Sequence, residues 1–256
     1  MKLAPLLLLL LAPQASAQTI VFYAGAVEHP IALSRLPAAT LAVRDPTDGG
    51  RRKILTGVTL ASVLAAQPAP SGADTLAVRA NDGWLSLIPL ATAARFPEAL
   101  LALAERRGDQ RAQPLGEPRG PVFLAWPNLS HAEVDADREL TPNGWTWAVA
   151  SLEYVRRVDF AGPLAPPSTA PPVAARGAAL FSRLCQHCHA INGAGGRAGW
   201  DLNAPNVLSY RSEAWVRGYI LDPRRRNPAS RMTAFRSQLG PGDLDALIAW
   251  FAALAH

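Results

Sequence analysis

Short apolar and β-branched runs recur along the first 160 residues and alternate with segments of helical pattern. The runs are TIVFY (19–23), TLAVRA (75–80), WLSLI (84–88) and PVFLA (121–125). Turn signals such as Asn81-Asp82-Gly83 bound them, as is typical of strands. Residues 59–66 and 96–107 have apolar positions at helical spacing, and the Asn143-Gly144 turn precedes a further predicted strand. This pattern predicts an α+β fold for residues 18–160.

The last third of the chain has helical patterns alone. Residues 173–189 predict a helix that leads up to two cysteines, and residues 212–223 predict a short helix with Ser212 as its N-cap. In the segment 242–254, the apolar residues recur at i, i+3, i+4 and i+7, which predicts a helix with one buried face. We therefore expect an all-α domain over residues 174–256.

A proline-rich, uncharged segment, AGPLAPPSTAPPV, covers residues 161–173. It has no apolar periodicity, so we expect an extended, semi-rigid spacer that tethers the two domains.

The N-terminus has the pattern of an export signal. Lys2 precedes an apolar core from Leu6 to Ala12, and Ala15-Ser16-Ala17 matches a cleavage site. The apolar run is too short to span a bilayer as a helix, although an N-terminal membrane anchor is the alternative interpretation. Residues 1–17 are therefore predicted to be a signal peptide, which places the mature protein in the periplasm of a bacterium.

Positive charge gathers in the second domain. Residues 174–256 contain ten arginines and five acidic residues, whereas residues 18–173 are nearly neutral. Much of the excess lies in RRRNPASRMTAFR, with Arg224, Arg225, Arg226, Arg231 and Arg236. A solvated face is one explanation. A docking surface for an acidic periplasmic redox protein is the other, and we expect no nucleic-acid partner.

The only two cysteines of the chain lie in Cys185-Gln186-His187-Cys188-His189. A disulfide between them would close a very small ring, and a zinc site would need a second pair of ligands. A thioredoxin-like pair belongs in a βαβ unit, whereas this one ends a predicted helix. C-x-x-C-H is the attachment signature of c-type haem, in which both thiols form thioethers and the histidine ligates the iron. We predict one covalent haem c with His189 as the proximal ligand.

The sixth ligand is predicted from composition. After removal of residues 1–17, Met232 is the single methionine, and it lies in the polar loop NPASRMTAF. Its thioether would favour Fe(II). His29, His131, His187 and His256 stand alone in the sequence, and His187 is expected to point between the two thioethers, from where it cannot easily reach the iron.

Residues 174–256 resemble class I monohaem cytochrome c. Gly177 and Phe181 lead into C-x-x-C-H on one helical face, and SRMTAF is similar to the R-M-P-A-F ligand loop of that family. The resemblance implies that this helix crosses the C-terminal helix, where Trp250 and Phe251 supply aromatic contacts. Thr233 replaces the usual proline after the ligand methionine.

The same resemblance implies further pocket residues. APNVL is aligned with the G-P-D-L segment of the family, so Pro205 is expected to offer its carbonyl to Nδ1–H of His189, with Ala204 replacing the usual glycine. Trp215 and Tyr219 are expected to line the haem pocket.

Residues 38–160 resemble the molybdopterin-binding domain of sulfite oxidase-type enzymes, through ILTGVTLASVLAA, ADTLAVRANDGWLSLIPL, GPVFLAWP and WTWAVASLEYV. In that family a cysteine thiolate ligates molybdenum, yet residues 18–173 contain no cysteine. The resemblance implies the fold without the metal, and we expect a docking module.

The whole chain is predicted to be an electron carrier rather than an enzyme. The alternatives are a molybdenum oxidoreductase that passes electrons to its own haem, and a haem sensor from which Met232 dissociates.

Overall fold

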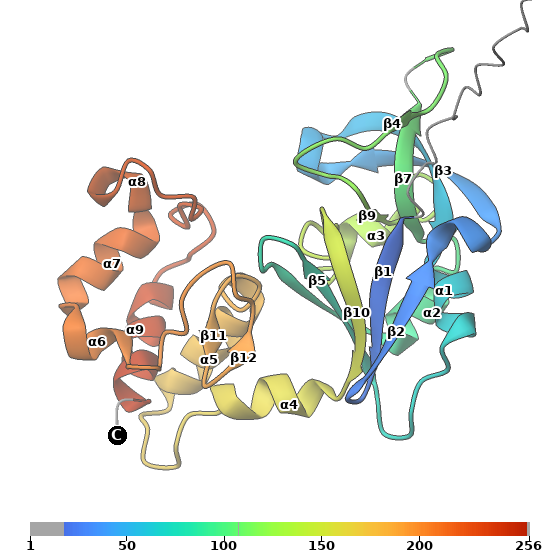
Figure 1. Ribbon diagram of the computed structural model, residues 1–256. Helices are drawn as coiled ribbons and strands as arrows, with labels where there is room; N and C mark the ends of the chain where they lie inside the picture. The colour runs from blue at the N-terminus through green and yellow to red at the C-terminus, as the bar shows by residue number, and fades with distance from the viewer. Residues whose placement is uncertain (1–17, 107, 255–256) are drawn as a thin grey trace, which may run out of the picture.

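The computed structural model describes residues 18–106 and 108–254, and the predicted signal peptide lies outside this range. Figure 1 shows a β-rich N-terminal domain and a helical C-terminal domain, joined by helix α4. Within the described residues, no helix combines the length and the apolar character needed to cross a membrane.

Two sheets make up the N-terminal domain. One has the order β2-β1-β10-β5-β6, and the other has the order β3-β4-β7-β8, with β9 also paired to β7. Strands β1 and β10 are parallel, and the other paired strands are antiparallel. The strands are β1 Thr19–Ala24, β2 Val27–Ala32, β3 Ala38–Asp45, β4 Arg51–Thr59, β5 Thr75–Ala80, β6 Leu85–Pro89, β7 Leu100–Arg106, β8 Gln113–Pro114, β9 Phe123–Ala125 and β10 Val149–Val155.

Short helices connect these strands, and the apolar faces of both sheets share one core. The helices are α1 Leu60–Ala66, α2 Leu90–Arg95 and α3 Glu133–Ala136. Helix α1 begins where Thr59 accepts a hydrogen bond from the backbone N–H of Ser62, which is a standard N-cap. The predicted strands at 19–23, 75–80, 84–88 and 121–125, the strand after the Asn143-Gly144 turn and the helix at 59–66 are thereby confirmed.

The predicted helix over residues 96–107 is wrong, because residues 100–106 form strand β7. Leu100, Leu101 and Ala102 are buried side by side. They pair with β4 on one side and with β9 on the other. A short apolar run of good helix formers cannot be distinguished from a central strand by periodicity, and pairing on both sides decided the outcome.

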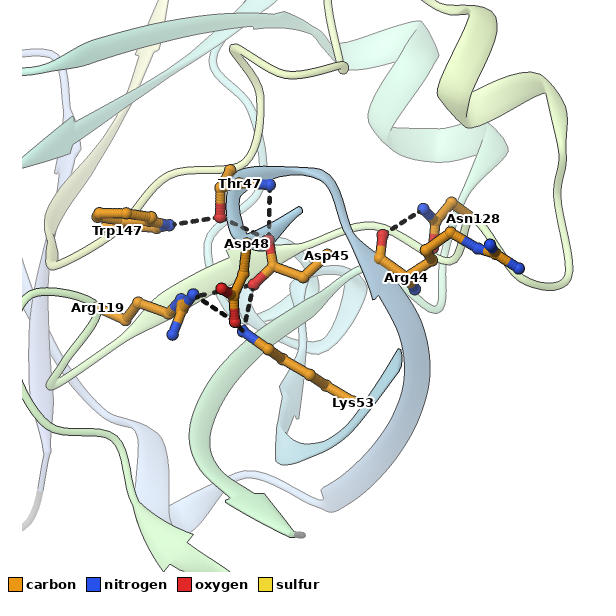
Figure 2. Close-up of polar contacts among 8 residues, drawn as sticks. All are labelled: Arg44, Asp45, Thr47, Asp48, Lys53, Arg119, Asn128 and Trp147. Atoms are coloured by element: carbon orange, nitrogen blue, oxygen red, sulfur yellow. Dashed lines mark hydrogen bonds and ion pairs between the residues drawn. The ribbon is translucent and has the colours of Figure 1, made fainter. Parts of the chain in front are cut away.

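A partly buried ion cluster fixes the hairpin between β3 and β4, with Asp45 and Lys53 buried and Asp48 and Arg119 partly exposed (Figure 2). Nζ of Lys53 lies 2.7 Å from Asp45 and 2.8 Å from Asp48, and Arg119 lies 3.1 Å from Asp48. Thr47 donates to Asp45 and accepts a hydrogen bond from Nε1 of Trp147. Two carboxylates face two cations, so the cluster is balanced, as buried charges must be.

The C-terminal domain is built on two crossing helices, α5 (Val173–Leu184) and α9 (Asp243–Ala253). The helices α6 Val207–Tyr210, α7 Glu213–Leu221 and α8 Pro223–Arg226 complete it, with the two-residue strands β11 Ala190–Ile191 and β12 Ala194–Gly195. Phe181 packs on Trp250 at a ring distance of 4.9 Å and on Phe251 at 6.2 Å. The expected crossing of the cysteine-bearing helix and the C-terminal helix is confirmed.

The segment 161–173 differs from the extended spacer that its composition suggested. Helix α4 (Arg157–Ala161) continues into a 3₁₀ turn at Gly162–Leu164. Leu164 is buried in the core of the C-terminal domain, and its carbonyl accepts a hydrogen bond from Nε1 of Trp250. An apolar side chain within the proline-rich segment thus anchors it, so the segment is not a free tether.

Candidate functional site

The two cysteines lie on the turn that ends helix α5. The backbone N–H of Cys185 still bonds to the carbonyl of Phe181, and the N–H groups of Cys188 and His189 both bond to the carbonyl of Cys185. This single tight turn therefore presents two thiols and an imidazole from five consecutive residues. The cysteines are not joined by a disulfide.

Both thiols are protonated in this environment. Burial raises the pKa of Cys185 to about 12 and that of Cys188 to about 11. A reactive redox pair needs the opposite shift, toward a thiolate at neutral pH. The described residues also contain no cluster of three His, Cys, Asp or Glu side chains suited to a metal ion, so the zinc alternative lacks a set of ligands there.

One ring nitrogen of His189 is hydrogen-bonded to the backbone, and the other is available as a metal ligand. Nδ1 lies 2.8 Å from the carbonyl oxygen of Trp200. A carbonyl can only accept, so Nδ1 carries the proton and Nε2 keeps the lone pair that a metal needs. Burial lowers the pKa of His189, against the opposing effect of this hydrogen bond. The ring is thereby kept neutral and ready to act as a ligand.

The hydrogen-bond acceptor of Nδ1 of His189 differs from the prediction, which assigned this role to the carbonyl of Pro205. Pro205 is exposed in the loop before α6, whereas Gly199 and Trp200 lie against the histidine. A Cβ built on Gly199 would lie 2.3 Å from Cε1 of His189, so only glycine leaves room for the ring. Gly199-Trp200-Asp201-Leu202 therefore occupies the place assigned to APNVL. Gly199, Asp201 and Leu202 match the glycine, aspartate and leucine of the G-P-D-L segment, and this match could have identified the segment from the sequence.

Asp201 fixes this loop. Its carboxylate accepts hydrogen bonds from the backbone N–H groups of Asn192, Gly193 and Asn203. Asn206 donates to the carbonyl of Phe251 and so ties the loop to α9. The backbone that orients His189 is thus attached to the main helical core.

Met232 lies in a loop that a chain of hydroxyl contacts holds in place. The Met232 backbone N–H donates to Oγ of Ser230, and the Tyr219 hydroxyl donates to the same oxygen at 3.0 Å. Tyr219 is stacked on Trp215 at 4.7 Å. Met232, Trp215 and Cys185 all pack against the same apolar core. The structure therefore brings the predicted ligand, one aromatic pocket residue and one thiol to one core, and Ser230 is a positioning residue that the sequence did not reveal.

The five predicted docking arginines are exposed around this loop. None of them pairs with an acid in the described part of the chain, whereas the acids of the C-terminal domain are engaged elsewhere. Glu213 and Asp245 share Arg217, Asp243 pairs with Arg176, and Asp222 caps α8. The positive charge of Arg224, Arg225, Arg226, Arg231 and Arg236 is consequently not compensated locally.

The residues present fit a c-type haem. Two unpaired thiols and a neutral imidazole with a free Nε2 share one turn, Gly199 leaves space for the ring, and a thioether borders the same core. This donor set of sulfur and imidazole suits haem iron.

Comparisons with known proteins agree with this chemistry. The family model for subunit III of cbb3-type cytochrome c oxidase matches residues 172–251. No match was found among curated proteins. The matched range covers the cysteine turn, Trp200 and Met232, so residues 172–251 form a cytochrome c segment, which implies a haem c and haem-based electron transfer.

Proposed function

We propose that the protein is a periplasmic electron carrier with one covalent haem c, ligated by His189 and Met232 in the manner of class I monohaem cytochromes. The observation that carries the proposal is the hydrogen bond from Nδ1 of His189 to the Trp200 carbonyl, because it leaves Nε2 of a neutral ring free beside two protonated thiols. When bound, haem c supplies an iron that changes between Fe(III) and Fe(II).

The residues of the chain hold and orient this group. Cys185 and Cys188 would provide the thioether links, and the Trp200 carbonyl and Gly199 fix the plane of the His189 ring. Tyr219 and Ser230 hold the backbone at Met232. His189 and Met232 would both ligate the iron and would leave no open coordination position for a substrate, which favours electron transfer over catalysis and over gas sensing. A ligand-sensing protein would instead show a changed visible spectrum when a small ligand is added.

The exposed arginines support an acidic redox partner. Charge steering raises association rates, and salt screens it over about 8–10 Å at ordinary ionic strength. Exposed pairs add less than about 1 kcal/mol each to affinity, so the effect belongs mainly to the rate of encounter.

Reversing the charge of Arg224, Arg225 and Arg226 to glutamate should therefore slow bimolecular electron transfer to an acidic partner several-fold at low salt. The difference should shrink as salt rises, when stopped-flow rates are compared at several ionic strengths. The control replaces the exposed residues Arg35, Arg51 and Arg52 of the N-terminal domain by glutamate, which changes the net charge by the same amount away from Met232. Equal slowing by both triple variants would mean that the arginines near Met232 are not the docking surface.

For the N-terminal domain we propose a docking role without a molybdenum cofactor. Residues 18–173 offer no cysteine as the metal ligand of the sulfite oxidase-type enzymes. Elemental analysis of the purified holoprotein should find about one iron per chain and no stoichiometric molybdenum. Stoichiometric molybdenum would favour the oxidoreductase alternative.

A further inference from the structure

The two residues between the cysteines contact the N-terminal domain. The turn between β5 and β6, residues 81–84, and the first residue of β6 lie against them. The N–H of Leu85 donates to the carbonyl of His187 at 2.9 Å, and Nδ1 of His187 donates to the carbonyl of Leu85 at 2.8 Å. The ring of His187 also stacks on Trp84 at 5.1 Å, with only 10° between the planes. Both the backbone carbonyl and the imidazole ring of His187 are therefore held by residues of the N-terminal domain.

The same turn contacts the glycine-rich segment that follows the cysteines. The N–H of Arg197 donates to the carbonyl of Gly83 at 2.7 Å. A Cβ built on Gly83 would lie 2.5 Å from the backbone of Arg197 and Ala198. The two backbones approach closely here, and only glycine permits it.

An apolar patch and a buried amide extend this contact. Leu85, Phe160 and Ala194 belong to one small buried cluster that joins the two domains. Nε2 of Gln186 donates to the carbonyl of Phe160 at 2.9 Å, and Gln186 is 3% exposed. The side chains of Gln186 and His187 thus each donate to a backbone carbonyl outside the C-terminal domain. Within that domain, Oε1 of Gln186 accepts a hydrogen bond from the Ser182 hydroxyl.

The connection between the domains favours a permanent contact. Phe160 packs in this bridging cluster and Leu164 in the core of the C-terminal domain. Four residue steps span at most about 14 Å, so the domains cannot move far apart. A short connection also gives a high effective concentration, at which modest contacts stay formed.

We infer that the β5–β6 turn of the N-terminal domain is a positioning element for the haem-attachment turn, and that Trp84 and Leu85 hold His187 so that Cys185, Cys188 and His189 keep their arrangement. This rests on the proposed function. The N-terminal domain would then exclude water from one side of the attachment turn. A redox partner would then approach the haem from the other surface, where the arginines flank Met232.

Glycine-to-alanine replacements at two turns of the N-terminal domain test this inference. Gly83 and Gly72 have φ values of +90° and +85°, so alanine strains both turns alike, but a Cβ at Gly72 meets nothing within 4 Å. In Gly83→Ala, the amides of Leu85 and Arg197 should exchange hydrogen at least about tenfold faster, because their partners withdraw. The backbone amides of Cys188 and His189 should also exchange hydrogen faster than in the wild type. In Gly72→Ala they should match the wild type.

The reduction potential reports on the iron itself. Water that reaches the attachment turn stabilises the ferric charge, so in Gly83→Ala the ratio of reduced to oxidised protein, poised against a mediator, should fall about threefold or more. Asp82 is exposed and its charge is screened, so contact with water is the larger effect. In Gly72→Ala the ratio should not change.

The outcomes separate the possibilities. Faster exchange at Leu85 and Arg197 with an unchanged potential and unchanged exchange at Cys188 and His189 would overturn the inference, since the contact would then merely join the domains. Should Gly83→Ala not fold, Trp84→Ala removes the stacked ring without backbone strain and is judged by the same measurements. A wild-type protein without covalent haem would refute the proposed function, while exchange at the attachment turn would still test the positioning role.

Discussion

Replacing Gly177 by alanine should unfold the cytochrome c segment at a much lower temperature than the wild type. Gly177 lies where helix α5 crosses α9, and a Cβ there would be 2.1 Å from the carbonyl oxygen of Ala246 and 2.6 Å from Cβ of Trp250. Neither atom belongs to a flexible side chain, so the helices must separate. Overpacking of this kind costs about 3 kcal/mol, and the better helix propensity of alanine offsets about 1 kcal/mol of it. The remaining destabilisation of about 2 kcal/mol should lower the melting temperature by about 8 to 16 °C in a domain of this size.

Gly218 in helix α7 provides the matched control. A Cβ there would meet only the end of the Arg226 side chain, at 3.0 Å, which can move away. Alanine is a better helix former than glycine by about 1 kcal/mol, so Gly218→Ala should leave stability unchanged or raise it. Thermal melts of both variants, followed by haem absorbance and circular dichroism, make the comparison. Equal melting temperatures would contradict the close crossing of α5 and α9.

Met232→His should cause the second large effect, a fall in reduction potential on the order of hundreds of mV. Axial ligands set haem potentials over roughly 0.8 V, and a thioether favours Fe(II) more than an imidazole does. The weak near-infrared band of sulfur-to-iron charge transfer should disappear in the oxidised variant. Potentiometric titration and a near-infrared spectrum are the two measurements.

Thr233→His is the control for Met232→His, because it adds the same ring at the neighbouring, exposed position. It should keep both the band and the potential. A near-infrared band that survives in Met232→His would show that another group is the sixth ligand.

Local patterns predicted the long helices of the C-terminal domain and, in the N-terminal domain, one helix and five strands, but not β2, β3 or β4. The N-cap Ser212 marks the beginning of α7 as the sequence suggested, and the helix leading to Cys185 carries Gly177 and Phe181 on its buried face. These signals are contained in a few neighbouring residues. Strand β7 was misread because its run of leucine and alanine suits a helix, and only its pairing with β4 and β9 decides otherwise.

Relations between distant segments could not be predicted. The carbonyl that Trp200 supplies to His189 is the exception, because Gly199, Asp201 and Leu202 around it match the G-P-D-L segment, which was assigned to APNVL instead. Leu164 is one apolar residue in a proline-rich segment, and its burial depends on a contact with Trp250 far along the chain. The pairing of Leu85 with His187 joins residues from two domains, and neither residue has a local pattern that points to the other.

The covalent attachment of haem to Cys185 and Cys188 is tested most directly by the intact mass of the holoprotein under denaturing conditions. Thioether bonds survive unfolding, whereas axial bonds from His189 and Met232 do not. Wild-type protein should keep the mass of one haem per chain, and the double variant Cys185→Ser, Cys188→Ser should lose haem completely on acid-acetone extraction. Haem that extracts cleanly from the wild type, or that remains bound in the double variant, would contradict this attachment.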